Sequence, residues 1–116
     1  MYNLFIDDER IPADVTWADY KTYIKYKSEE WVIARSFKEV KSMISEFGFP
    51  DFISFDHDLG YNQQTGYIIC QWLCDLIIDE KYKFPENFDF YVHSKNPVGA
   101  ENIKKYMNNF IKRWKE

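Results

Sequence analysis

The 116-residue sequence has few of the features that direct a chain to a membrane or to an oxidising compartment. No apolar run is long enough to span a bilayer, and a strand pattern that starts at Tyr2 leaves no room for a signal peptide. The only cysteines, Cys70 and Cys74, lie four residues apart in an apolar run, which is typical of buried hydrophobic side chains rather than of a metal or redox pair. We therefore expect a cytoplasmic protein that does not contact membranes.

An excess of positive charge is also missing. The formal net charge is −4, so the composition gives no argument for general DNA binding. No internal repeat or low-complexity linker divides the chain, and residues 1–116 suit a single domain that buries roughly two thirds of its surface. The abundance of Lys, Ile, Asn, Tyr and Phe is compatible with an A/T-rich genome, such as that of a virus of bacteria.

Three apolar segments of the chain are each followed directly by titratable side chains. Residues 52–55 carry no charge and suit a strand that is buried on both faces of a parallel sheet. The segments that follow strands are Asp7-Asp8-Glu9-Arg10, Asp56-His57-Asp58-Leu59-Gly60 and His93-Ser94-Lys95-Asn96. Ligands of open α/β sheets bind outside the carboxyl ends of the strands, so we expect these residues to share one functional edge.

Helix signals separate the predicted strands, which span residues 2–6, 31–35, 52–55 and 88–92. Ser36 and Glu39 have the spacing of a capping box and predict a helix that Gly48 ends. Thr65 is a suitable N-cap for a helix over residues 66–80, and Asn96-Pro97 can start the last helix.

Residues 13–30 leave two structures open. Thr16 to Asp19 could cap a helix with Trp17, Tyr20 and Ile24 facing inward, whereas residues 22–27 alternate in the manner of a strand. The alternation of strands and helices elsewhere predicts an α/β fold with a parallel sheet and right-handed crossovers. The strand order 2-1-3-4 would bring Asp7, Asp8, Asp56 and Asp58 together.

Such a group of carboxylates favours a divalent cation. Carboxylates held close together raise one another's pKa, and a hard cation relieves their repulsion. Mg²⁺ or Mn²⁺ prefers carboxylate oxygens and water, so we predict ligands among Asp7, Asp8 and Asp56, with Asp58 in reserve. Taken singly, each acid is better explained as a helix cap or an exposed loop residue.

The two histidines of the chain, His57 and His93, both fall at this predicted edge. A histidine beside carboxylates can act as an acid or a base, so we predict catalytic roles for Asp56, His93 and His57. Ser94, Asn96 and the N–H groups that start the last helix could hold a phosphate, and Gly99 would admit a ligand close to the backbone. Arg10 and Lys95 would add positive charge; the alternative for each is a solvated surface side chain.

The same residues carry a family resemblance. Asp7-Asp8 and Asp56 resemble the acidic pocket of two-component receiver domains, and a closer match is the receiver-like family named for cyclic-phosphate processing. The blocks that carry the match are Asp7 to Arg10, Arg35-Ser36, Ser54 to Gly60, Thr65-Gly66-Tyr67 and His93 to Gly99. The resemblance implies a three-layer, flavodoxin-like fold, truncated to about four strands. It also implies a role in processing cyclic phosphates formed in RNA repair or nucleotide metabolism. We expect Arg10, Thr65, Ser94, Asn96 and Gly99 to bind the substrate phosphate.

Two functions from different classes remain open on this basis. One is a metal-dependent phosphoesterase that acts on a cyclic phosphate, with a small nucleotide-like ligand or an RNA end as its partner and surplus aromatic side chains to stack a base. The other is a non-catalytic receiver-like module that binds a nucleotide or a protein. A phosphorelay switch is disfavoured, because His93-Ser94 stands where receivers place one Thr or Ser and no predicted fifth strand supplies their lysine.

Overall fold

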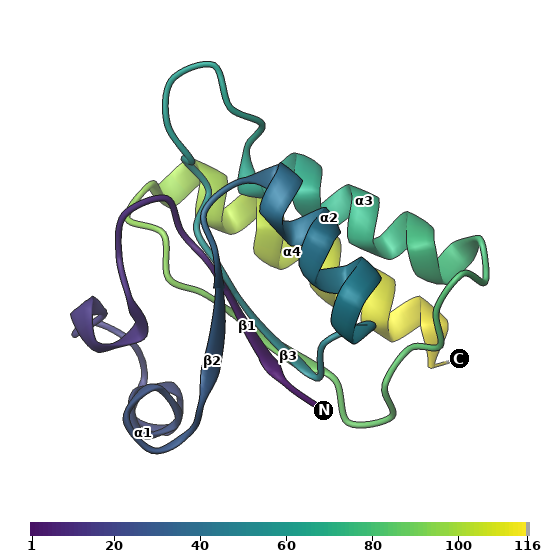
Figure 1. Cartoon of the computed structure of the whole chain (residues 1–116), viewed down its shortest axis with the longest axis horizontal. Helices are drawn as coiled ribbons and strands as arrows, with labels where there is room; N and C mark the ends of the chain where they lie inside the picture. The colour runs from purple at the N-terminus through teal and green to yellow at the C-terminus, as the bar shows by residue number, and fades with distance from the viewer. Residues whose placement is uncertain (116) are drawn as a thin grey trace.

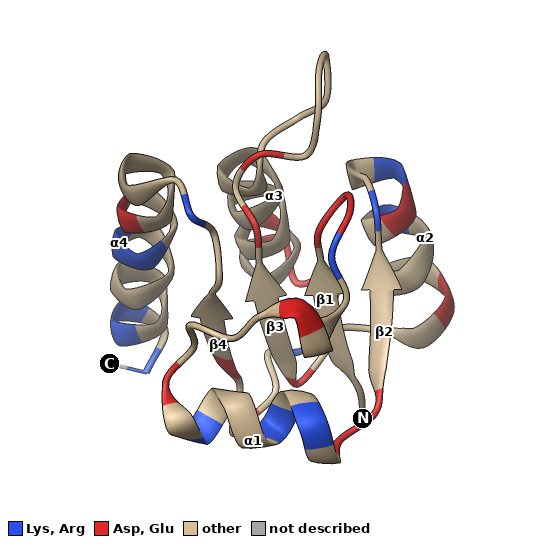
Figure 2. Ribbon diagram, turned by 90° about the vertical axis from the view of Figure 1, so that its left-hand side faces the viewer, with Lys and Arg blue, Asp and Glu red and all other residues tan. Residues whose placement is uncertain are grey.

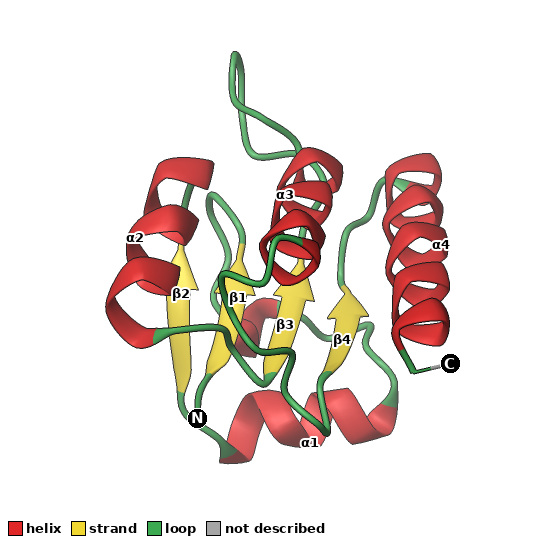
Figure 3. Ribbon diagram, turned by 90° about the vertical axis from the view of Figure 1, so that its right-hand side faces the viewer, coloured by secondary structure: helices red, strands yellow, loops and turns green. Residues whose placement is uncertain are grey.

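The computed structural model describes residues 1–115 as four parallel strands between layers of helices. The strands are β1 (Asn3–Ile6), β2 (Trp31–Ala34), β3 (Phe52–Phe55) and β4 (Asp89–Val92). They pair in the order β2-β1-β3-β4, as the sequence predicts, and all their arrows point the same way (Figure 3). Asn3 pairs with both Trp31 and Phe52, so β1 and β3 are the central strands.

Four α-helices and one short 3₁₀ helix surround the sheet. They are η1 (Pro12–Asp14), α1 (Tyr20–Ser28), α2 (Phe37–Phe47), α3 (Gly66–Ile78) and α4 (Pro97–Trp114). Helices α2, α3 and α4 cover one face of the sheet, and α1 lies on the other face (Figure 1). The three-layer α/β receiver-like architecture expected from the sequence is therefore confirmed.

The alternation of side chains along the central strands explains why both faces need a cover. Leu4 and Ile6 of β1 point into the main core beneath α2, α3 and α4, whereas Phe5 packs with Val15 and Tyr26 on the α1 side. In β3 the same alternation places Ile53 and Phe55 in the main core. All four residues of β3 are buried, so the uncharged segment predicted to be a two-sided strand is one.

The predicted helix starts are confirmed at three positions. The side chains of Ser36, Thr65 and Asn96 accept hydrogen bonds from the N–H groups of Glu39, Ile68 and Gly99, respectively. Each of these bonds satisfies one of the N–H groups that the first turn of a helix leaves without a partner.

Helix α3 ends at Ile78 rather than at residue 80, because Glu80 adopts a left-handed conformation with φ of 58°.

In the segment that the sequence left open, residues 20–28 form the helix α1, and its inward face differs from the prediction. Asp19 is the N-cap of α1, and the buried residues of the helix are Thr22 and Tyr26. Trp17, Tyr20 and Ile24, predicted to face inward, are 37%, 78% and 42% exposed. The helix starts one turn later than the Thr16 cap would place it, so a different set of side chains faces the sheet. Within residues 1–115, no helix has the length and apolar character needed to cross a membrane.

Candidate functional site

The carboxyl ends of β1 and β3 bring acidic residues together at one edge of the sheet. Figure 2 shows acidic segments directly after both strands, at the same edge. Asp56 follows β3, and its backbone N–H donates to the carbonyl of Ile6 in β1, which continues the pairing to the last residue of each strand. Asp7 and Asp56 directly follow the paired last residues of two adjacent parallel strands, so their side chains lie close together at this edge.

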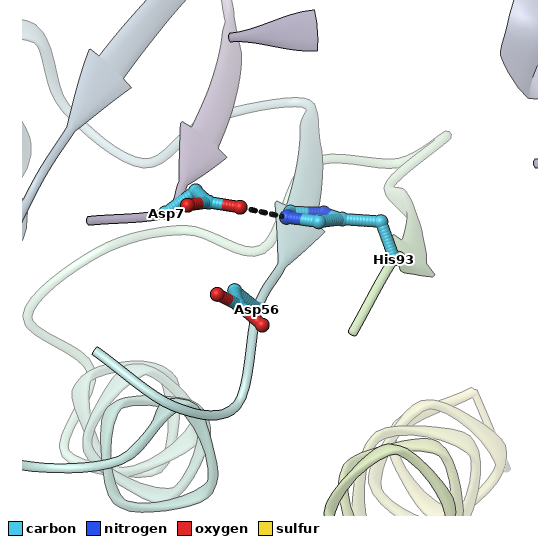
Figure 4. A group of neighbouring side chains, drawn as sticks. All are labelled: Asp7, Asp56 and His93. Atoms are coloured by element: carbon cyan, nitrogen blue, oxygen red, sulfur yellow. Dashed lines mark hydrogen bonds and ion pairs between the residues drawn. The ribbon is translucent and has the colours of Figure 1, made fainter. Parts of the chain in front are cut away.

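Asp7 is buried and accepts hydrogen bonds at both carboxylate oxygens. Its Oδ1 accepts from the backbone N–H groups of Glu9 and Arg10, each at 2.9 Å. Its Oδ2 lies 2.9 Å from Nε2 of His93, so the loop after β1 and the end of β4 meet at one carboxylate (Figure 4). Burial raises the pKa of Asp7, but the His93 hydrogen bond and the two N–H donors outweigh it, and the pKa lies well below its ordinary value.

Asp56 is also buried, but its carboxylate is less well compensated. The backbone N–H of His57 donates to its Oδ1 at 2.8 Å, and the nearest cation to its Oδ2 is Arg10 at 3.9 Å, beyond hydrogen-bond range. Burial, together with the charge of Asp7, raises the pKa of Asp56 above its ordinary value. The pair therefore consists of one carboxylate that is strongly held as an anion and one that carries charge at a cost.

Arg10 occupies the space between the two acids. Its Nη1 lies 3.3 Å from Oδ2 of Asp7 and 3.9 Å from Oδ2 of Asp56. The loop that presents it is held from the other side, because Arg35 donates to the carbonyls of Asp7 and Arg10. The guanidinium also lies over the ring of Trp17, with its carbon 5.2 Å from the ring centroid. Arg10 is thus a half-buried cation that lies beside both acids.

A cleft of about 580 Å³ opens over these residues. Five acidic and two basic side chains line it, with several small or neutral residues between them. The lining residues are Asp7, Asp8, Glu9, Arg10, Asp56, Asp58, Gly60, Ser94, Lys95, Asn96 and Pro97. All four predicted metal ligands line this one cleft, as do Arg10, Ser94 and Asn96 of the predicted phosphate-binding set.

Four predicted site residues do not line the cleft. Thr65 caps α3, and Gly99 packs against the ring of His57. His57 itself has Nδ1 2.9 Å from Oδ1 of Asp58, so a His–Asp pair stands at the rim. His93 is fully buried behind Asp7, and its ring is stacked on Phe5 with the centroids 4.5 Å apart and the planes 4° from parallel.

The start of α4 offers fewer N–H groups to an anion than the sequence suggests. Pro97 has no N–H, and the Asn96 side chain accepts the hydrogen bond from Gly99. The Asn96 amide also donates to Oδ2 of Asp58 at 3.2 Å, which joins this helix to the loop after β3. Asn96 therefore serves as a cap and a brace, and positive charge at this side of the cleft comes from Lys95.

Sequence reasoning missed two residues that contact the site from behind. Ser54 lies 2.7 Å from Nδ1 of His93, and Tyr26 lies 2.5 Å from the Ser54 hydroxyl. One signal for Ser54 was present, because a serine in the middle of a strand that is buried on both faces needs a hydrogen-bond partner. No comparable signal marked Tyr26, since the sequence left its segment open between helix and strand.

Comparison with known proteins supports the fold and supplies the family. A family model described as the cyclic-phosphate processing receiver domain matches residues 2–109. No match is found among curated proteins. A solved structure described as a fusion to the yeast Spc42 trimeric coiled coil, amino acids 181–211, is similar with a TM-score of 0.54 and 21% sequence identity. The match covers 90% of this chain and 61% of that chain, and at this identity it shows a shared fold.

The family match covers all four strands and the acidic cleft. Three of the blocks that carried the resemblance contribute residues to that cleft: Asp7 to Arg10 after β1, Ser54 to Gly60 at the end of β3, and His93 to Gly99 after β4. The chain belongs to the cyclic-phosphate processing receiver domain family.

Proposed function

We propose that this protein is a metal-dependent phosphoesterase that opens a cyclic phosphate. The observation that carries the proposal is the charge of the cleft, where five acidic side chains face two basic ones. A phosphate ester would be repelled by such a surface unless a cation entered with it. The family's association with cyclic-phosphate processing gives the chemical class of the ligand.

Two carboxylates that line the cleft, Asp7 and Asp56, fit Mg²⁺ or Mn²⁺. His93 lies behind Asp7, and one ligand atom from each of the three residues lies within 4.8 Å of the other two. Both cations prefer carboxylate oxygens and water, so Asp7 and Asp56 would hold the ion, with Asp8 or Asp58 acting directly or through water. The Oδ2 of Asp56 supports this assignment, because its ion partner Arg10 lies 3.9 Å away and a bound cation would reduce the cost of its charge.

The residues around the acids have separate roles in the proposed reaction. When bound, the metal ion would polarise the phosphoryl oxygens and stabilise their developing negative charge. Arg10 and Lys95 would contact the remaining phosphate oxygens from the rim. Either water or the carboxylate of Asp56 would attack phosphorus while the ring P–O bond breaks, and the released oxygen would take up a proton. Attack by Asp56 would leave an aspartyl phosphate, which water would then hydrolyse to restore the carboxylate. The His57–Asp58 pair stands where a histidine can exchange that proton with solvent.

The size of the cleft agrees with a small phosphorylated nucleotide or the end of an RNA strand. Ligand clefts for small molecules span about 300–1,000 Å³, and this one is about 580 Å³. Trp17 stands beside it, 37% exposed, with Lys95 4.2 Å from its ring centroid. An aromatic ring beside a cation and a phosphate site would offer a nucleotide a surface for its base and positive charge for its phosphate.

The test is hydrolysis of a panel of cyclic phosphates with Mg²⁺ or Mn²⁺. The panel holds a 2′,3′-cyclic nucleotide, an ADP-ribose cyclic phosphate and a cyclic dinucleotide. Wild type is compared with Asp56→Asn, which keeps the shape of the side chain, and with His93→Ala. Asp75→Asn is the matched control, because Asp75 is exposed on α3 and the substitution removes one negative charge, as Asp56→Asn does. We expect metal-dependent turnover that Asp56→Asn and His93→Ala abolish and Asp75→Asn leaves unchanged.

Two other outcomes would contradict all or part of this proposal. Measurable Mn²⁺ binding without turnover of any panel member would favour a non-catalytic module that binds a nucleotide or a protein partner. Absence of Mn²⁺ binding, measured by calorimetry at millimolar metal, would overturn the metal site itself.

A further inference from the structure

A row of four buried polar side chains crosses the sheet behind the cleft. It runs from Tyr26 on α1 through Ser54 in β3 and His93 after β4 to Asp7 after β1. The three successive distances are 2.5 Å, 2.7 Å and 2.9 Å. None of the four residues is more than 5% exposed. A buried polar row is stable only when each donor meets an acceptor, so its hydrogen bonds must follow a definite order.

For a neutral His93 ring, the direction of that order follows from which groups can donate and which can only accept. An ionised Asp7 carboxylate can only accept, so Nε2 of His93 carries the proton in their bond. In the neutral imidazole Nδ1 is then an acceptor, and the Ser54 hydroxyl must donate to it. The Ser54 oxygen remains free to accept from the Tyr26 hydroxyl. Tyr26 keeps its proton, because burial raises its pKa above the ordinary value.

The reverse order of hydrogen bonds leaves one proton without an acceptor. A proton on Nδ1 of a neutral His93 would turn the Nε2 lone pair towards the Asp7 carboxylate. Ser54 would then accept from His93 and donate to Tyr26, whose own proton has no other acceptor among the hydrogen bonds of residues 1–115. Only the order that begins at Tyr26 and ends at Asp7 satisfies every group.

The side chains around His93 prevent its ring from rotating away from Ser54 and Asp7. Phe5 lies parallel to it at 4.5 Å between centroids, and the indole N–H of Trp17 donates to the His93 carbonyl at 2.9 Å. The ring has no exposed surface. Phe5 therefore fixes the plane of the His93 ring, Trp17 fixes its backbone, and Ser54 fixes its tautomer. The ring then presents its single N–H, at Nε2, to Asp7.

From this arrangement we infer that Tyr26 and Ser54 are positioning residues: they hold His93 as an Nε2–H donor, and His93 thereby orients Asp7 as an ionised ligand for a cation. The part of the inference that concerns the cation rests on the proposed function. The part that concerns the tautomer of His93 depends on the protein alone. Neither residue contacts the cleft, so neither would touch a substrate. The inference also makes His93 a partner of the metal ligand rather than a ligand itself, because its Nε2 is occupied.

The first measurement reads the histidine directly. Long-range ¹H–¹⁵N correlation NMR of the two imidazole rings distinguishes the neutral tautomers and reports whether Nδ1 accepts a hydrogen bond. We expect His93 in the Nε2–H form with a hydrogen-bonded Nδ1 in wild type. Ser54→Ala should shift the Nδ1 resonance towards that of a free acceptor, and Tyr26→Phe should shift it less. His57, whose ring lies outside the row, is the internal reference and should not shift.

The second measurement is Mn²⁺ affinity by calorimetry, with the metal alone as the probe. Loss of a partner that orients a metal ligand typically weakens binding 10- to 100-fold, so we expect a loss of about 10-fold in Ser54→Ala. We expect a loss of about threefold in Tyr26→Phe, because Ser54 can still donate to His93. Tyr20→Phe and Ser42→Ala are the matched controls, since both residues are exposed and lie outside the row.

The outcomes separate this inference from the proposed function. His93 in the Nδ1–H or the cationic form in wild type overturns the inference, and so does Ser54→Ala with wild-type Mn²⁺ affinity and an unshifted Nδ1. If wild type binds no Mn²⁺, the proposed function fails and the NMR experiment alone decides: an Nε2–H ring that responds to Ser54→Ala supports the hydrogen-bond order, and one that does not overturns it.

Discussion

The imidazole ring of His57 fills the space that a side chain at Gly99 would occupy. A Cβ atom at Gly99 would lie 2.3 Å from Cγ of His57 and 2.6 Å from its Nδ1. The glycine therefore admits a side chain of the protein itself, where the sequence suggested a ligand. This contact fixes the start of α4 against the loop after β3, and with it the His57–Asp58 pair at the rim of the cleft.

Two glycine substitutions should differ in cost because of what each new Cβ would meet. Gly99→Ala pushes on a side chain that can move, and we expect a loss of roughly 1–3 kcal/mol in the free energy of unfolding. At Gly66 the Cβ meets the backbone carbonyl of Asp56, so Gly66→Ala must displace β3 or α3 and should cost more. Urea denaturation checks the order. Equal effects of the two substitutions would contradict it.

Asp7→Asn should destabilise the metal-free protein. The folded-state pKa of Asp7 lies below its unfolded value, so its contribution to stability is present above about pH 4 and is lost as the pH falls through the folded-state pKa. An amide retains the shape but not the charge that His93 and two N–H groups contact, and we expect a loss of roughly 3 kcal/mol. Thermal unfolding from pH 8 down to about pH 2 should show a flatter acid limb for the variant below about pH 4. An unchanged limb would argue against the assignment.

Asp56→Asn should stabilise the metal-free protein, whereas Asp7→Asn should destabilise it. Here the folded-state pKa lies above the unfolded value, so the folded state binds more protons and its stability falls as the pH rises through this range. Removing the charge should raise Tm at pH 7 by about 4 °C, which corresponds to about 1 kcal/mol in a small domain. The same variant should lose the increase in Tm that Mn²⁺ gives to wild type. A lower Tm without metal would show that Arg10 compensates the Asp56 charge fully.

Arg10→Gln should strengthen metal binding while weakening phosphate binding. The guanidinium lies 3.3 Å from Asp7 and competes with a cation for the same oxygens, so we expect Mn²⁺ affinity to rise by about threefold to tenfold without it. The KM for a cyclic phosphate should rise, because Arg10 lines the cleft. Arg113→Gln, which makes the same change in charge on the exposed end of α4, is the control and should alter neither value. Lower Mn²⁺ affinity in Arg10→Gln would mean that Arg10 supports the ligands rather than competing with a cation.

Local sequence determined the elements and most of the cleft. Uncharged apolar segments marked the strands, and Ser36, Thr65 and Asn96 marked helix starts because capping needs only side chains close in sequence. Parallel strands with right-handed crossovers then placed Asp7 and Asp56 at one edge, since both residues directly follow a strand. The acidic cleft could be predicted because it depends on strand order alone.

Tertiary structure decided what stands behind that cleft. Whether Tyr26 reaches Ser54, 28 residues away, depends on α1 starting at Asp19 and turning Tyr26 rather than Tyr20 towards the sheet. Whether His93 lines the cleft or lies beneath it depends on the packing of Phe5 and Trp17 around it. These contacts join segments distant in sequence, and their geometry follows from how helices and strands pack, which no local pattern of residues encodes.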